Sequence, residues 1–129
     1  MGGMNGILGS GLVSPGLPTY PPTVGDLVVT GEITPAEALG TYTFAGFTTN
    51  ALYGRTPYWT NGSWFILYTW RNAFLQYDRW VLSDSLTVDY AEWASTPDDA
   101  NADPGNPVDT YELDFNAAGV TGTPIVAEA

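Results

Sequence analysis

The sequence predicts an all-β fold, a small antiparallel β-sandwich or half-open barrel preceded by an extended N-terminal arm. Residues 63–70 alternate aromatic and apolar side chains, with further apolar residues between them. This is typical of a central strand that is either covered on both faces or covered on one face and used for binding on the other. Residues 78–84 follow after one short connection and predict an antiparallel partner. All five tryptophans lie between Trp59 and Trp93. Because burying one large aromatic side chain contributes roughly 4–6 kcal/mol, this region should hold the core.

Three elements are expected before these runs. Residues 27–30 form a β-prone run, which predicts an edge strand leading into the domain. Residues 34–40 have Thr at the N-cap, Pro at the first helical position and Gly at the end, so they predict a single helical turn or a compact loop. Residues 41–44 alternate and predict another strand.

A hairpin is expected next. Residues 55–60 predict a strand, and Pro57 should keep it at a sheet edge or a bulge because proline cannot donate to a ladder. The Asn61-Gly62 pair that follows is a strong hairpin signal, and it joins this strand to residues 63–70.

The second half of the chain predicts two further strands. Residues 87–93 continue the alternation, and residues 96–108 read as a loop. Residues 110–115 alternate again, with Glu112 and Asp114 expected outward. The side chains expected inward are Tyr111, Leu113 and Phe115.

Composition divides the chain into an arm at 1–25, a β domain at 26–116 and a C-terminal tail at 117–129. The arm is rich in Gly, Pro, Ser and Thr, and its apolar residues follow neither a helical nor a strand period. Such a segment is either a disordered linker or a docking element that takes its shape from a partner. In the second interpretation the docking side chains are Ile7, Leu8, Leu12, Val13, Leu17 and Tyr20.

Charge and residue usage restrict the possible functions. The chain has three arginines, no lysine or histidine, and fourteen acids, for a net charge of −11. Nucleic acids and anionic membranes require clustered Lys and Arg, so neither is an expected partner. Without His, Cys and Lys the chain has no Ser-His triad, no thiolate nucleophile and no Cys/His zinc site. We expect no enzymatic activity and no cofactor.

Four segments in chain order carry a family resemblance: G-T-Y-T-F at 40–44, Y-G-R-T-P-Y-W-T at 53–60, W-F-I-L-Y-T-W at 64–70 and R-W-V-L-S-D at 79–84. Together they resemble a small aromatic-rich β domain of tailed-bacteriophage virion structural proteins and some large bacterial surface proteins. The similarity runs from Val28 to about Trp93.

The resemblance also has a departure. That family often has a P-x-G-x-W element before its final strand, whereas here Pro104 and Gly105 lead to Tyr111 without a tryptophan. The resemblance implies a non-enzymatic role in or on a phage particle, and it assigns no functional residues.

An aromatic platform is one candidate site. Flat aromatic faces can stack on sugar rings, and the residues that could form such a platform are Trp59, Trp64, Tyr68 and Trp70. The alternative is that the same side chains fill the core, which their alternation in a two-faced strand favours.

A calcium loop is a second candidate. Asp99, Asn101 and Asp103 have the oxygen spacing that begins such a loop. Pro104 replaces the expected glycine and Thr110 stands where the bidentate acid belongs, so a solvated acidic loop without metal is expected.

The remaining candidates are charged pairs. Two nearby carboxylates suffice for glycoside hydrolysis, but fourteen acids produce such pairs by chance. The pairs considered are Asp78 with Asp84 and Asp89 with Glu92. Arg55 and Arg79 are expected to satisfy buried or interfacial carboxylates, with Asp84 and Asp78 as natural partners.

The sequence therefore predicts a virion structural protein at the particle surface, a capsid decoration, cement or fibre-type protein. Its partners would be the major capsid protein or other virion subunits, and it would form a homo-oligomer in the particle. A carbohydrate-binding β module that reads a glycan or receptor is the alternative. A small hydrolase is the third interpretation.

Overall fold

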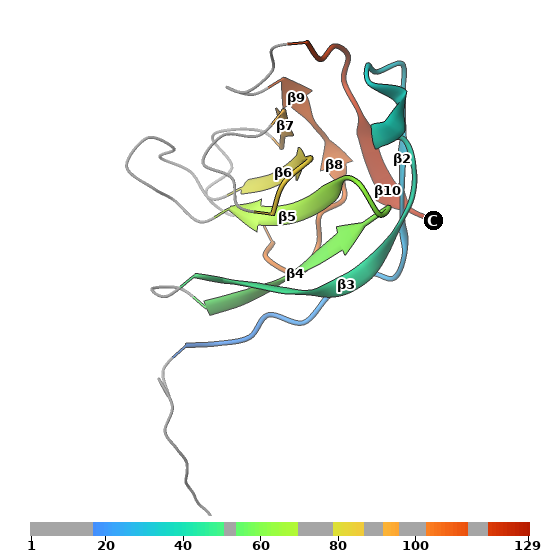
Figure 1. Ribbon diagram of the computed structural model, residues 1–129. Coiled ribbons are helices and arrows are strands. Elements are labelled where there is room, and N and C mark those ends of the chain that lie inside the picture. Colours follow the sequence, from blue (N-terminus) through green and yellow to red (C-terminus); the bar gives the residue numbers. More distant parts are fainter. Residues whose placement is uncertain (1–16, 51–53, 70–78, 87–91, 96–102, 114–118) are drawn as a thin grey trace, which may run out of the picture.

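The computed structural model describes residues 17–50, 54–69, 79–86, 92–95, 103–113 and 119–129 (Figure 1). These residues form short strands and a single 3-10 turn, which confirms the all-β prediction. The elements are β2 (Leu27–Thr30), η1 (Ala36–Ala38), β3 (Gly40–Asn50), β4 (Gly54–Thr60), β5 (Phe65–Thr69), β6 (Arg79–Ser83), β7 (Trp93–Ala94), β8 (Asp109–Thr110), β9 (Glu112–Leu113) and β10 (Ile125–Glu128).

The strands form a nearly closed antiparallel barrel. Their order is β8-β10-β2-β3-β4-β5-β6-β7-β9. From β2 to β7 neighbours in the wall are also consecutive in the chain, whereas β10 pairs with β2 and β8, and β7 pairs with β9. The two strands at the ends of this order, β8 and β9, are separated only by Tyr111. One extended segment therefore pairs with β10 through its first half and with β7 through its second half, and this joins the two ends of the sheet.

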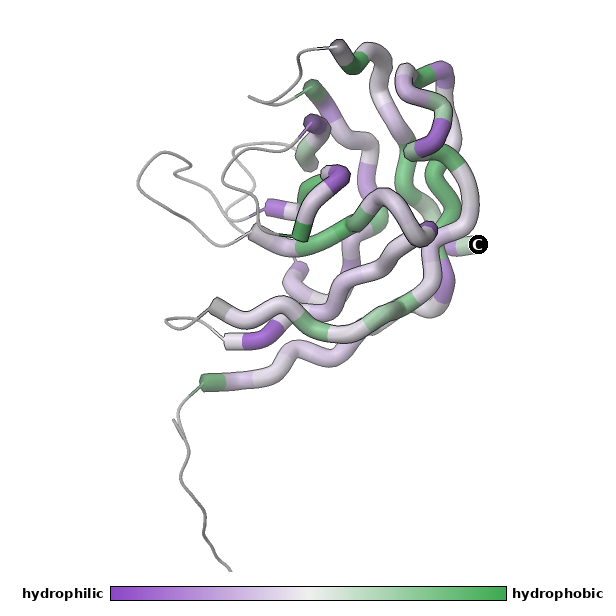
Figure 2. The backbone as a smooth tube through the Cα atoms, in the orientation of Figure 1, coloured by the Kyte–Doolittle hydropathy of each residue, from purple (hydrophilic) through white to green (hydrophobic). Residues whose placement is uncertain are grey.

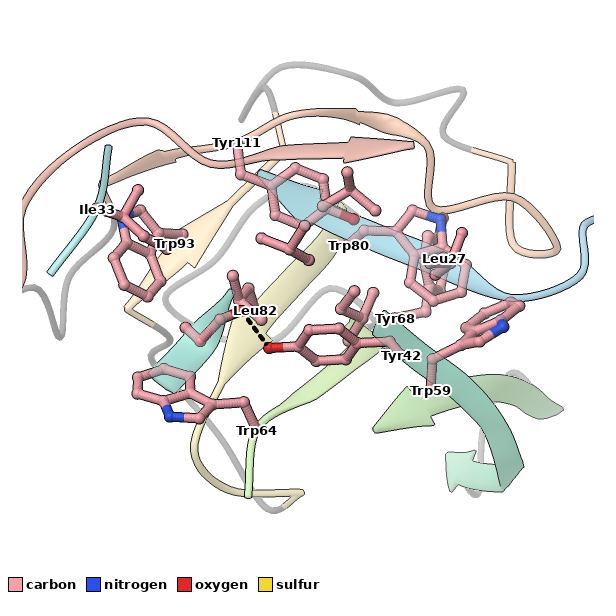
Figure 3. Packing of buried hydrophobic residues seen from close by; sticks show 14 residues of the cluster. Leu27, Ile33, Tyr42, Trp59, Trp64, Tyr68, Trp80, Leu82, Trp93 and Tyr111 are labelled. Carbon is pink, nitrogen blue, oxygen red and sulfur yellow. Dashed lines mark hydrogen bonds between the residues drawn. The ribbon is translucent and has the colours of Figure 1, made fainter. Parts of the chain in front are cut away.

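Aromatic side chains fill the interior of the barrel (Figure 3). Alternate positions of each strand point inward, as strand geometry requires. Trp80 contacts the rings of both Trp59 and Tyr68, with centroids 5.8 and 5.2 Å apart. Trp64 and Trp93 form a further pair at 5.6 Å. The other buried members of this cluster are Leu27, Val29, Ile33, Ala38, Tyr42, Ile66, Leu82, Tyr111 and Val126.

Polar groups on these aromatic residues hold the loops. The indole N–H groups of Trp59, Trp80 and Trp93 donate to the carbonyls of Gly25, Asp103 and Gly122 at 3.0, 2.8 and 3.0 Å. The hydroxyls of Tyr42 and Tyr111 donate to the carbonyls of Ala38 and Pro107, each at 2.6 Å. Each of these five carbonyls is thus bound to a side chain that the core holds in place.

The opposite face of the central strands is also buried. Leu67, Val81 and Ala94 form a second apolar cluster on β5, β6 and β7. Figure 2 shows β5 as mostly apolar along its length. The prediction of a central strand at residues 63–70 is therefore confirmed for β5, and of its two alternatives the one with both faces covered is correct. Its predicted antiparallel partner is β6.

Two predictions in the first half need correction, one for a strand and one for a helical turn. Residues 27–30 form β2, but this strand is not at an edge, because β3 and β10 pair with its two sides. The turn predicted at 34–40 is present as η1, but its N-cap is Pro35, without a side-chain cap hydrogen bond. The chain therefore enters this turn one residue later than the predicted Thr34 cap.

The hairpin prediction is confirmed, with a longer turn. Trp59 and Thr60 of β4 pair with Ile66 and Phe65 of β5. The side chain of Asn61 accepts hydrogen bonds from the backbone N–H groups of residues 63 and 64, so four residues rather than two make the connection.

Two predictions for the C-terminal half are wrong. Residues 117–129 are not a tail, because Ile125–Glu128 is the barrel strand β10, which pairs with β2 and β8. Leu113 was expected inside but is 52% exposed, since the short strand β9 lies where the wall closes. Tyr111 is buried as predicted, and Phe115 lies outside the described residues.

Candidate interaction surface

The predicted aromatic platform is not on the surface. Trp59, Trp64 and Tyr68 expose only 0%, 7% and 4% of their area, because they occupy inward positions of β4, the following turn and β5. The platform interpretation is wrong for these three residues, which are core side chains. Trp70 lies outside the described residues.

The candidate metal and acid sites are only partly described. Within the ranges given above, no group of three or more Asp, Glu, His or Cys residues is arranged to hold a metal ion. Asp103 uses a carboxylate oxygen to accept a hydrogen bond from the N–H of Gly105 at 2.8 Å, which makes a local turn. Glu92 is buried and Asp84 is exposed. The other acids of the predicted sites, Asp78, Asp89 and Asp99, and the amide Asn101 lie outside the described residues.

Two buried tyrosines are structural groups. Burial raises the pKa of the Tyr42 hydroxyl well above its ordinary value. Burial, and after it the negative charge of Asp109, raises the pKa of Tyr111. Both phenols therefore remain protonated at neutral pH and act as hydrogen-bond donors.

The two described arginines have different surroundings. Arg79 is buried in β6, and the side chain of Thr69 donates to its carbonyl at 3.1 Å. Arg55 is exposed in β4, and its Nε donates to the hydroxyl of Thr19 at 2.9 Å. The described contact of Arg55 is thus with the N-terminal segment and not with the carboxylate that the sequence suggested.

Residues 17–25 lie along the chain's own barrel (Figure 1). The N–H of Arg55 donates to the carbonyl of Pro18 at 3.0 Å, and the N–H of Tyr20 donates to the carbonyl of Arg55 at 2.9 Å. These bonds form a parallel bridge to β4. Further along, the N–H and hydroxyl of Thr23 donate to the carbonyl of Gly105 at 2.9 and 3.1 Å.

The N-terminal segment can bind β4 because β5 pairs with only part of that strand. β5 pairs with β4 only at Trp59 and Thr60, so the first half of β4 has an edge that β5 does not cover. The N-terminal segment takes that edge at Arg55. Pro57 lies in this same half, which agrees with the expectation that proline would keep the strand at an edge.

Two glycines allow the close approach. A Cβ atom on Gly54 would lie 2.3 Å from the carbonyl oxygen of Pro18, and one on Gly105 would lie 2.7 Å from that of Pro21. Either contact is too short for a side-chain carbon, so a larger residue would displace the segment. We use the name arm seat for residues 17–25 together with the contacts that bind them to the barrel. The predicted docking residues Leu17 and Tyr20 are half-buried in it.

The rest of the predicted docking set, Ile7, Leu8, Leu12 and Val13, lies outside the described residues. The structure therefore separates the predicted arm into residues 1–16 and the arm seat. Sequence reasoning missed the seat because its contacts join positions 36 and 82 residues apart.

Exposed aromatic side chains mark a second surface, on the β3–β4 hairpin. Phe44 and Phe47 are 43% and 40% exposed, and their rings meet edge to face with centroids 5.5 Å apart. A β-bulge interrupts the pairing of β3 between Phe44 and Gly46. The exposed phenylalanines thus lie on both sides of a bend in this strand.

In the described part of the chain, no helix is long and apolar enough to cross a membrane. Comparison of the chain with protein-family models, with curated proteins and with solved structures finds no match. The candidate site therefore depends on geometry alone, and it comprises the arm seat and the exposed β3 surface.

Proposed function

We propose that this chain is a non-enzymatic virion structural protein of a tailed bacteriophage, a capsid decoration, cement or fibre-type protein held on the particle through its N-terminal residues. The arm seat is the observation that supports the proposal most. It fixes Pro18 beside Gly54, so residues 1–16 are attached at a defined point on the barrel. An assembly protein needs such a fixed origin for a segment that binds a neighbour.

The packed interior of the barrel is a second observation that supports an assembly role. With β8 and β9 counted as one segment, the wall has eight strands. A barrel of about eight strands has an interior just wide enough for side chains or one small ligand, and large aromatic residues occupy this one. Function then depends on the outside of the barrel. The order of the aromatic-rich strands, which resembles that of phage virion domains, makes a particle the proposed location.

The proposed partners are the major capsid protein or other virion subunits, together with further copies of this chain. The apolar side chains that would be buried against them are Ile7, Leu8, Leu12 and Val13. Leu17 and Tyr20 would serve as the link to the barrel, because the arm seat already holds them.

A truncation tests this proposal. Deleting residues 2–16 removes the proposed anchor and leaves the arm seat in place. We expect the full-length chain to band with purified particles in a density gradient. The truncated chain should stay free while it keeps the same denaturant midpoint and tryptophan fluorescence.

A matched control keeps the length of the segment. Replacing Ile7, Leu8, Leu12 and Val13 by Ser retains the chain but removes its apolar contacts, so this variant should also stay free. Banding of either altered protein with particles would contradict the anchor, and a full-length chain that never bands would contradict the virion proposal.

The glycan-binding alternative has lost its main support. Three of the four aromatic side chains that suggested it, Trp59, Trp64 and Tyr68, are buried in the barrel. We therefore do not propose it as the function.

A further inference from the structure

One edge of β3 has a row of backbone groups that no other described strand pairs with. β2 pairs with β3 only at Gly40, Thr41 and Tyr42, whereas β4 pairs with it as far as Asn50. Beyond Tyr42, no backbone group from the described residues pairs with β3 on the side of β2. We call Thr43–Thr49 the β3 edge. An unpaired edge of this kind presents alternating N–H and C=O groups that another strand can bind.

The chemistry of the β3 edge is unusual for this chain. Natural proteins protect open edges with charged residues or proline, but Gly40–Asn50 contains neither. The fourteen acids of the chain all lie elsewhere. The β3 edge instead exposes Phe44 and Phe47 among threonines, a composition that suits strand pairing.

The other edge of the same hairpin, on β4, shows how an extended segment can bind the backbone groups of a strand edge. On β4 the N-terminal segment takes the backbone groups of Arg55. The hairpin thus has one edge occupied within its own chain and one edge, the β3 edge, that the rest of the described chain leaves unpaired. The β-bulge at Phe44 and Gly46 bends β3 just past the last residue that pairs with β2. Bulges re-aim the strand that carries them, so the bend separates the open half from β2.

We infer that the β3 edge is a docking surface for the β3 edge of a second copy, so that two barrels join by antiparallel strand pairing in a symmetric dimer. Two copies that each carry a net charge of −11 repel one another wherever carboxylates face. An uncharged edge is where they can meet without burying a carboxylate. A two-fold axis brings the same patch of each copy together, and antiparallel pairing of identical strands satisfies that symmetry.

The dimer also accounts for the exposed aromatic pair. Pairing along the β3 edge brings Phe44 and Phe47 of one copy close to the same residues of the other, because neighbouring strands lie only about 4.8 Å apart. Their exposed ring faces would then be covered. This inference deepens the proposed assembly function by naming the surface through which copies of the chain bind one another.

A charge placed on the edge tests the inference. Size-exclusion chromatography with light scattering should give twice the chain mass for the full-length protein and the chain mass for Phe47→Lys. Leu113→Lys is the matched control, since it places the same charge at an exposed apolar residue on β9 and should remain a dimer. Far-UV circular dichroism should show that all three proteins fold alike.

Cross-linking locates the contact independently. The chain has no cysteine, so Ala45→Cys introduces a single thiol at the bulge. A short bis-maleimide should convert this variant into a covalent dimer. Ser63→Cys, exposed in the turn before β5, should stay a monomer on denaturing gels.

Three results would overturn the β3 contact: a monomeric full-length protein at the highest soluble concentration, a dimer that persists in Phe47→Lys, or a dimer that is lost when residues 2–16 are deleted. The last result would make the N-terminal segment the occupant. These measurements use purified protein without particles, so they can fail while the particle experiment succeeds, and the reverse.

Discussion

We predict that adding one methyl group at Gly54 releases the N-terminal segment from β4. Gly54→Ala adds a Cβ atom that would lie 2.3 Å from the Pro18 carbonyl oxygen, so the segment has to leave β4. The substitution also strains the backbone, because Gly54 has a φ of 130°. Gly62→Ala is the matched control: its φ is 106°, but a Cβ there meets nothing within 4 Å.

The expected loss follows from the bonds that the segment makes beside Gly54. Arg55 and Tyr20 contribute two backbone hydrogen bonds, and the Arg55 side chain contributes a third to Thr19. At about 0.5–1.5 kcal/mol net for each, their sum is about 1.5–4.5 kcal/mol. This is an upper bound, because the released residues regain conformational entropy. Backbone strain of about 1–3 kcal/mol applies to both variants and cancels in the comparison.

Amide hydrogen exchange and urea unfolding together check this reasoning. In Gly54→Ala the N–H groups of Tyr20 and Arg55 should lose their protection, and in Gly62→Ala they should keep it. The free energy of unfolding should be lower in Gly54→Ala than in the control by an amount within the calculated bound. If Gly54→Ala keeps both amides protected, the close approach of Pro18 to Gly54 is not needed for the segment to bind β4, and the reasoning above is wrong.

Two further predictions concern the buried tyrosines. Tyr111→Phe leaves the Pro107 carbonyl without its donor and should lower the free energy of unfolding by about 1–3 kcal/mol in urea titrations; an unchanged midpoint would show that water replaces the hydroxyl. Alkaline pH should also destabilise the barrel. The raised pKa values of Tyr42 and Tyr111 mean that each phenol ionises in the unfolded chain near its ordinary value of 10.0 but resists ionisation when folded. Stability from these groups is therefore complete below that pH and falls above it, and the Tyr42→Phe/Tyr111→Phe double variant should show a flatter decline.

Local patterns predicted the central strands well, and the structure shows why. In β5 and β6 every second side chain enters the barrel and most residues between them are also buried, which is why the apolar pattern on both faces identified central strands. The same pattern gave no information on which face of the sheet would be closed. Trp59 and Trp64 were for that reason candidates both for the core and for a platform, and only the curvature of the wall decides.

Closure of the barrel could not be predicted from sequence. The strand β10 has only two strongly apolar residues, Ile125 and Val126, in a segment of Gly, Thr and Pro. Its ladder with β2 joins residues almost 100 positions apart, such as Val126 and Val29. Pairing across such a distance depends on the whole sheet having curved round, and no local signal reports that.

The core and the exposed strand β3 carry different kinds of aromatic residue, and this difference bears on the proposed assembly role. Tryptophan and tyrosine in the core each contribute a large ring, and five of them also donate to a loop carbonyl. One of these donors is Trp59, which binds the carbonyl of Gly25, so a core side chain also holds the end of the N-terminal segment. Phenylalanine has no polar group to hold a loop, and in the described residues Phe44 and Phe47 are exposed while Phe65 is half-buried. A ring that neither fills the core nor ties down a loop costs free energy in water. The exposure of such rings beside an uncharged strand edge, which has no partner among the described residues, is accounted for if another chain covers them.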